Sequence, residues 1–207
     1  MAPRPGDPPA AWAPSRTALP PHGCPDLTGA FANRPADAHP RSAAQPLALH
    51  EVFGLDGRGV GVFGVRDEER PWPALPDAAT ATFTLDGDSL GVRFRDAAAG
   101  EAVLALRRLS VNASERKWDA YYYCGDTDFG PAAHFPGPRV PIGGVPGEYG
   151  ELDLQIVSLF RGTDGALIVR HRTDRHRFTA PPHGPSGSRV RTMGSTWWRY
   201  PAAERRP

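Results

Sequence analysis

The sequence predicts an all-β domain: an antiparallel meander that forms a lipocalin-like barrel or half-barrel and carries one short helix. Three observations lead to this prediction. About eight short segments alternate apolar and polar residues, Gly- and Asp-rich turns separate them, and helical spacing recurs in one brief segment only. A two-layer β-sandwich is the alternative, because both architectures bury one face of each antiparallel strand.

Composition limits the class of protein. The chain has 207 residues, with 24 Lys and Arg against 23 Asp and Glu, a formal net charge of +1. This length suits one domain with a real core. The charge balance predicts no nucleic-acid partner. No run approaches the roughly 18 apolar residues of a membrane span, so we expect no transmembrane segment.

Three regions follow from the distribution of prolines. Seven prolines within the first 21 residues predict a disordered leader over 1–23. This leader lacks the apolar core of a signal peptide. Residues 24–201 are predicted to be a single β-domain, and residues 202–207 a disordered tail.

The first elements of the domain are short. A strand is predicted over 26–33, with Leu27 and Phe31 facing the core. A two-turn helix is predicted over 47–53, because Leu49, Val52 and Phe53 recur at helical spacing before a glycine. A glycine-rich strand is expected around 60–65.

The strongest alternation begins at residue 80. Alternating segments over 80–86, 89–95 and 102–106 predict a three-strand meander, with Asp86-Gly87-Asp88 forming its first turn. The short connections predict antiparallel neighbours.

A second hairpin is predicted farther along, from strands over 152–158 and 167–171 joined by a turn at 162–165. The last strand, 195–200, is predicted to place Trp198 and Tyr200 on the face opposite Trp197. Between the meanders, 131–149 is rich in Pro and Gly and is predicted to be a long loop that covers a binding face.

Two cysteines, Cys24 and Cys124, are separated by 100 residues. An even number allows one disulfide between them, and two unpaired thiols are the alternative. A catalytic role is disfavoured, since no base or cationic group adjoins Cys124 in the sequence.

The segment around Cys124 is the densest mixture of aromatic and acidic residues. A ligand platform could consist of Trp118, Tyr121, Tyr123, Asp126 and Asp128. The alternative is an ordinary strand with Tyr121 and Tyr123 inside and Tyr122 outside. Asp126 and Asp128 lack the further ligands of a calcium loop, so we predict no metal site.

A basic run covers residues 170–177, with four arginines around His171 and His176. We expect a solvated strand end there. A site for phosphate, an anionic lipid or an acidic partner surface is the alternative.

The segment Gly23-Cys24-Pro25-Asp26-Leu27-Thr28-Gly29, followed by Phe31-Ala32-Asn33, together with Trp197-Trp198-Arg199-Tyr200 near the end, resembles small uncharacterised bacterial lipoproteins. The resemblance implies lipid attachment at Cys24 and a periplasmic or membrane-anchored domain. The residues at 20–22 depart from a lipobox, and a cytoplasmic location remains the alternative. Lipid attachment and a disulfide compete, because both use the sulfur of Cys24.

For function we expect a non-catalytic, envelope-type β-domain that binds a small apolar or amphipathic ligand at the barrel mouth, without a cofactor. The alternative is a structural or protein-interaction domain with a filled core, whose partner is an envelope protein. An enzyme is disfavoured, because the sequence contains only scattered His and Asp. His134, His171 or His176 beside Asp126 or Asp128 would favour catalysis.

Overall fold

The fold comes from a computed structural model that describes residues 9, 12, 24–39, 47–53, 79–96, 100–108, 121–127, 130–141, 149–179 and 189–203. Side chains are not described for residues 121, 126–127, 130–131, 135–141, 149–152, 178–179 and 189. The strand expected around 60–65 lies outside these ranges. Among the described residues, no helix has the length and hydropathy needed to cross a membrane.

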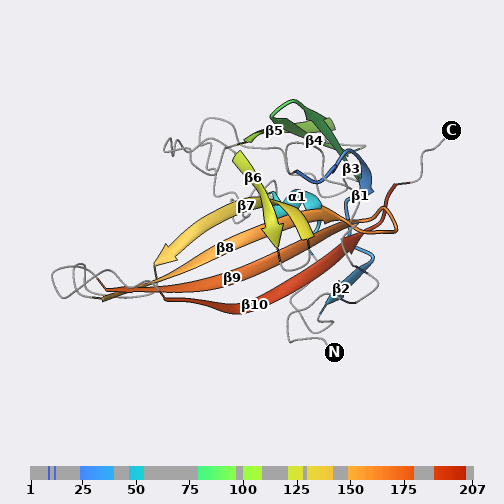
Figure 1. The fold of residues 1–207 in the computed structure, drawn as a ribbon. Coiled ribbons are helices and arrows are strands. Elements are labelled where there is room, and N and C mark those ends of the chain that lie inside the picture. The colour runs from blue at the N-terminus through green and yellow to red at the C-terminus, as the bar shows by residue number, and fades with distance from the viewer. Residues whose placement is uncertain are drawn as a thin grey trace.

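The described chain is mostly β, as predicted (Figure 1). Its elements are β1 Gly29–Ala32, β2 Asp37–His39, α1 Leu49–Val52, β3 Thr80–Asp86, β4 Ser89–Asp96, β5 Gly100–Arg108, β6 Tyr121–Thr127, β7 Gly130–Pro141, β8 Tyr149–Arg161, β9 Leu167–Thr179 and β10 Arg189–Tyr200. They form one ten-stranded sheet in the order β1-β3-β4-β5-β6-β7-β8-β9-β10-β2. Every neighbouring pair is antiparallel except β5 and β6, which are parallel over two residue pairs.

The sheet is not closed into a barrel, so of the predicted alternatives the structure agrees with the half-barrel or the two-layer arrangement. Its two edge strands, β1 and β2, are close in sequence, and one isolated bridge links Phe31 of β1 to Ala202. The Ala32 N–H donates to the Pro201 carbonyl at 2.9 Å, and the Ala203 N–H donates to the Ala30 carbonyl at 2.8 Å. Within the described residues, the chain after β10 therefore meets β1 around this single bridge.

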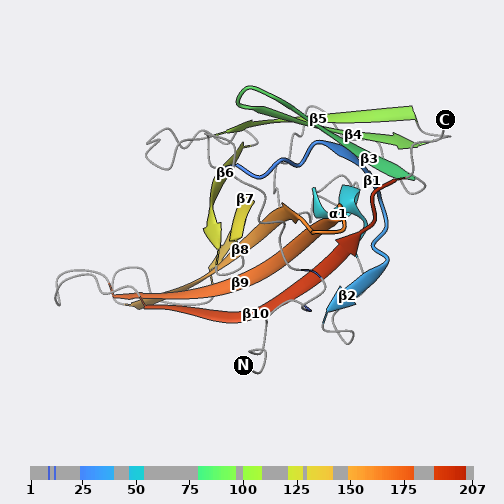
Figure 2. The same ribbon diagram turned by 45° about the vertical axis from the view of Figure 1, so that its right-hand side comes forward.

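The helix α1 fills the space inside the curved sheet. Figure 2 shows it between β3–β5 on one side and β8–β10 on the other. Leu49, Val52 and Phe53 are at most 2% exposed and pack with Phe83 and Phe94. These side chains pack with those of the sheet to form one continuous apolar core.

Polar groups from distant strands hold α1 in place. The Asn33 carbonyl accepts from the Leu49 N–H at 2.7 Å, and its side-chain oxygen accepts from the His50 N–H at 3.0 Å. The Asn33 side-chain amide donates to His50 Nδ1 at 2.8 Å. Tyr200, whose pKa is raised by burial, donates to the Leu47 carbonyl at 2.6 Å. A helix of one turn is too short to be stable alone, so these bonds and the core must supply its stability.

The predicted three-strand meander is confirmed as β3, β4 and β5. Phe83, Leu90, Val92 and Phe94 are all buried on the inner face. On the outer face, Arg93 and Arg95 lie 3.3 and 3.2 Å from the carboxylate of Glu101. Gly87 adopts a φ of 58° in the first turn, a conformation that favours glycine.

The predicted loop over 131–149 is wrong for most of its length, because Gly130–Pro141 forms β7. Its prolines misled the prediction. β6 pairs with β7 only from Gly130 to His134, so the rest of β7 pairs with β8 alone. A register shift between Pro136 and Arg139 absorbs Pro138. Proline is tolerated on such edges and at bulges.

The strands β8, β9 and β10 are longer than predicted and extend well beyond α1 (Figures 1 and 2). Residues 149–156, 172–179 and 189–195 form this part, which we call the extension. The rest of these strands packs on the core, with Trp198 and Tyr200 inward and Trp197 on the opposite face, as predicted.

Candidate functional site

The inner face of β8–β10 changes from apolar to charged as the strands leave the core. Strand pairing places Leu159, Val169 and Trp198 side by side in the core. The next three rows along the inner face are Val157, His171 and Thr196, then Gln155, Thr173 and Gly194, then Asp153, Arg175 and Arg191. The face is therefore amphipathic along its length. We call the rows from Trp198 to Arg191, which begin in the core and continue into the extension, the inner face of the extension.

His171 lies where the apolar part of this face ends. Its ring stacks on the Trp198 indole, with centroids 6.1 Å apart and planes 18° apart. Burial lowers the pKa of His171 below its ordinary value of 6.5. His171 is therefore neutral at neutral pH and presents a flat surface with one donor and one acceptor.

The indole N–H of Trp198 has an unusual environment. The Trp198 side chain is 3% exposed, and its Nε1 has no hydrogen-bond partner among the described residues. Buried donors of this kind are rare, because each one loses its water without gaining another acceptor. An acceptor atom supplied from outside the chain would satisfy it.

Farther out, the inner face carries ordered polar pairs. The Thr173 hydroxyl donates to Gln155 Oε1 at 3.0 Å. Arg175 donates to both carboxylate oxygens of Asp153, at 3.0 and 3.1 Å, and these bonds lower the pKa of Asp153. The exposed Arg191 is paired in register with Arg175, so two guanidinium groups lie at this end.

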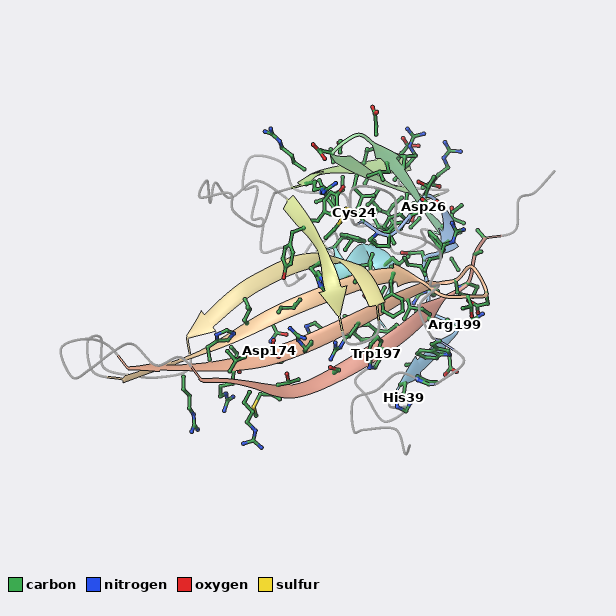
Figure 3. The ribbon with its side chains drawn as sticks, viewed as in Figure 1. Cys24, Asp26, His39, Asp174, Trp197 and Arg199 are labelled. Atoms are coloured by element: carbon green, nitrogen blue, oxygen red, sulfur yellow. A yellow bond between two sulfur atoms is a disulfide. The ribbon has the colours of Figure 1, made fainter. Side chains whose placement is uncertain are left out.

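The opposite face of the sheet carries a transverse row formed by Tyr123, His134, Ser158, Arg170, Trp197 and His39. Tyr123 stacks on His134 with centroids 5.0 Å apart. His134 Nδ1 lies 2.9 Å from the Ser158 hydroxyl. Figure 3 labels Trp197 and His39 at the far end of this row.

The His134–Ser158 pair has the contact of a base and a nucleophile, but both side chains are nearly inaccessible, at 8% and 4% exposure. Burial lowers the pKa of His134, with Arg172 and Arg170 acting in the same direction, against a hydrogen bond to the Gly125 backbone. We interpret the pair as a satisfied polar contact within the sheet. The proposed catalytic clusters with Asp126 or Asp128 involve side chains outside the described residues.

The structure contains the disulfide between Cys24 and Cys124, with Cα atoms 5.1 Å apart. Cys24 is 5% exposed and belongs to the core cluster. The bond links the segment before β1 to β6. The paired sulfur of Cys24 is not free to carry a lipid.

The expected ligand platform is described only in part. Trp118 and Asp128 lie outside the described residues, and Tyr121 and Asp126 belong to β6 without described side chains. Tyr122 is 2% exposed in the core and Tyr123 is on the other face, so the expected alternation of these tyrosines is reversed. The disulfide could have indicated this: Cys124 must face Cys24 in the core, and Tyr122 shares its face.

Tyr123, the one platform residue with a described side chain, lies on the face opposite the inner face of the extension. The sequence prediction did not single out the key residues of that inner face as a site. The basic run over 170–177 was the signal in the sequence that could have indicated this site. Side chains alternate along a strand, so His171, Thr173 and Arg175 of this run share one face and the residues between them lie on the other. Within the described ranges, no group of three or more His, Cys, Asp or Glu side chains is placed to hold a metal ion.

Comparison with protein-family models, curated proteins and solved structures finds no match for this chain.

Proposed function

We propose that the protein is a non-catalytic, envelope-type binding domain that takes a small amphipathic ligand with an anionic group on the inner face of the extension. On binding, the side chains that cover Val157 and Trp198 move aside, and the apolar part of the ligand lies along these two residues and the half-buried His171. Its anionic group lies toward Arg175 and Arg191. A ligand acceptor atom receives the Trp198 indole N–H.

The observation that carries the proposal is the indole of Trp198, 3% exposed and without an acceptor among the described residues. Ligand sites combine apolar surface with a few fixed polar groups that orient the ligand. The stacked pair of His171 and Trp198 supplies flat apolar surface at this position. The Trp198 indole N–H, which has no acceptor among the described residues, orients the ligand.

Charge at the far end of the face supports an anionic group. Asp153 offsets only one of the two guanidinium groups of Arg175 and Arg191. Arginine recognises carboxylate and phosphate through paired N–H donors. The disulfide between Cys24 and Cys124 is consistent with an oxidising compartment such as the periplasm, the location that the lipoprotein resemblance implies.

The test uses laurate as the probe, with dodecanol as its uncharged counterpart. We expect saturable binding of laurate, weaker binding of dodecanol, and a shift of the Trp198 indole N–H signal in ¹⁵N NMR spectra. Trp198→Phe keeps a ring but removes the donor. It should leave laurate binding unchanged, because the hydrocarbon end of laurate has no acceptor, and should weaken binding of 12-hydroxylaurate, whose terminal hydroxyl supplies one, about tenfold, the effect of one hydrogen bond.

Arg191→Gln should weaken laurate binding and leave dodecanol binding unchanged. Arg95→Gln on β4 is the matched control, because it removes an exposed arginine from the outer face of the meander. Binding of 12-hydroxylaurate that is equal in Trp198→Phe and in the wild type would contradict the proposal.

A second candidate is a protein-interaction domain with a filled core. It is favoured by the packing of α1 inside the sheet and by the exposure of Val190 and Met193, 55% and 46%, on β10 of the extension. Native mass spectrometry of protein purified gently from its source separates the two. A retained small molecule supports the binding domain, and a retained protein supports the interaction domain.

A further inference from the structure

A buried apolar patch lies on the face of the sheet that points away from α1. It is formed by Ala132, Phe160, Ile168 and Trp197, from four adjacent strands, and each is at most 2% exposed. Phe160 and Trp197 make an edge-to-face contact with ring centroids 5.9 Å apart. We call these four residues the outer patch.

Trp12 covers the outer patch. Its side chain is 6% exposed and belongs to the same cluster as the four patch residues. The Trp12 N–H donates to the Pro9 carbonyl at 2.8 Å. Both residues belong to the region that the sequence predicts to be a disordered leader.

Charged groups surround the patch. The Arg170 guanidinium carbon lies 5.0 Å from the centroid of the Trp197 ring. Arg199, paired in register with Ile168, donates to Asp164 at 2.9 and 2.6 Å. Figure 3 labels Arg199 and Trp197 on the same part of β10. An apolar centre with a charged rim is the anatomy of a protein–peptide interface.

Trp12 lies far from the patch residues in the sequence. Eleven residues, 13–23, lie between Trp12 and Cys24 in the sequence. The disulfide to Cys124 of β6 fixes the far end of this connection. With so few residues between them, the covalent connection keeps Trp12 at a millimolar effective concentration near the sheet. The contact therefore has the form of a peptide bound to a domain, with the peptide supplied by the same chain.

We propose that the outer patch is a binding site for a short, proline-flanked tryptophan segment, and that Trp12 occupies it in cis. The ligand class follows from the occupant: a tryptophan whose indole is seated on aromatic and aliphatic side chains and whose backbone N–H is bonded to the carbonyl of a preceding proline. A segment with the same chemistry from another protein would have to displace the chain's own Trp12.

The test uses the full chain with Trp12→Ala, which uncovers the patch without shortening the protein. The probe is a fluorescein-labelled peptide of residues 7–16, followed by fluorescence anisotropy. We expect saturable binding to Trp12→Ala and binding at least tenfold weaker to the wild type, whose patch is occupied. The same peptide with alanine at position 12 is the matched control and should not bind.

Trp12→Leu keeps a smaller apolar side chain over the patch, and its affinity for the peptide should lie between those of the other two proteins. This variant also serves if Trp12→Ala does not fold, which circular dichroism would show. Equal peptide binding by the wild type and Trp12→Leu would overturn occupation in cis. Failure of the folded variants to bind the peptide would overturn the site itself.

Laurate binding separates this proposal from the proposed function, because the two sites lie on opposite faces of the sheet. Trp12→Ala is expected to bind laurate as the wild type does.

Discussion

The strands β8–β10 have one half that packs near α1 and a second half that forms the extension. The two halves share the same strands and continuous pairing, yet they differ in which other parts of the molecule cover them. Near α1, Val169 and Ile168 face opposite sides of the same strand and both are fully buried. In the extension, Thr192 and Met193 are exposed, and the inner face carries hydrogen-bonded pairs. The comparison shows that backbone pairing alone continues a sheet, while contact with the core decides how much each side chain contributes to stability.

The largest expected effect tests the disulfide, which belongs to the core on which one half of β8–β10 packs. Replacing both cysteines, Cys24→Ser with Cys124→Ser, frees the unfolded chain from a closed loop of about 100 residues. The chain-entropy relation gives a loss of about 4.7 kcal/mol in the free energy of unfolding. Urea denaturation measures this, with the wild type in reductant as a parallel. A loss below about 1 kcal/mol would mean that the packed half holds without the link.

Phe83→Ala and Val190→Ala contrast the core on which one half of β8–β10 packs with the extension. Phe83 is fully buried against Phe31 and Phe53, so its truncation should lower the free energy of unfolding by about 4 kcal/mol. Val190→Ala in the extension is the counterpart, and the exposed side chain should change stability by less than about 0.5 kcal/mol. Similar losses for the two variants would remove the distinction between the halves.

Acid should destabilise the protein through histidines on both faces of the long sheet. Burial lowers the pKa of His134 and of His171, so the unfolded chain binds protons more readily than the folded one. Their stabilising contribution is present above pH 6.5 and is lost as pH falls from there toward the lowered folded pKa values. Each can add a slope of at most about 1.4 kcal/mol per pH unit. Urea midpoints at pH 7.5 and pH 5.5 measure this, and His171→Gln should reduce the difference between them.

The smallest effect concerns a single hydrogen bond in the extension. The Thr192 hydroxyl donates to Asp174 at 2.8 Å, and Arg172 also binds this buried carboxylate. Thr192→Val should cost about 1 kcal/mol. Thr196→Val is the matched control, because no hydrogen bond of its hydroxyl is found among the described residues. Equal effects would show that the loss of a hydroxyl, rather than of this bond, is being measured.

Local patterns in the sequence predicted the regular parts of the fold. The alternation from Thr80 to Leu106 predicted β3–β5, and helical spacing predicted α1, although only Leu49–Val52 is helical. β7 was missed because proline signals a loop unless the strand is known to lie at an edge. Edge position depends on which strands pair, and that is a tertiary property.

The candidate site was harder to predict, because it depends on register. His171 meets Trp198 because β9 and β10 pair in the register that places Thr196 opposite His171 and Trp198 opposite Val169, and no local motif specifies that register. The lack of an acceptor for the Trp198 indole among the described residues is likewise invisible in the sequence. Trp12 gave no periodic signal, since its contacts come from four strands far along the chain.

The hydrogen bond from Tyr200 to Leu47 spans 153 residues. A ribosome adding about 5 to 20 residues per second needs about 8 to 30 seconds to travel that distance. During this interval the segment containing α1 has been made, but the last strand that anchors it has not. The packing around α1 therefore cannot be completed from the amino terminus onward, and the apolar residues of this segment wait for their last partner until β10 has been made.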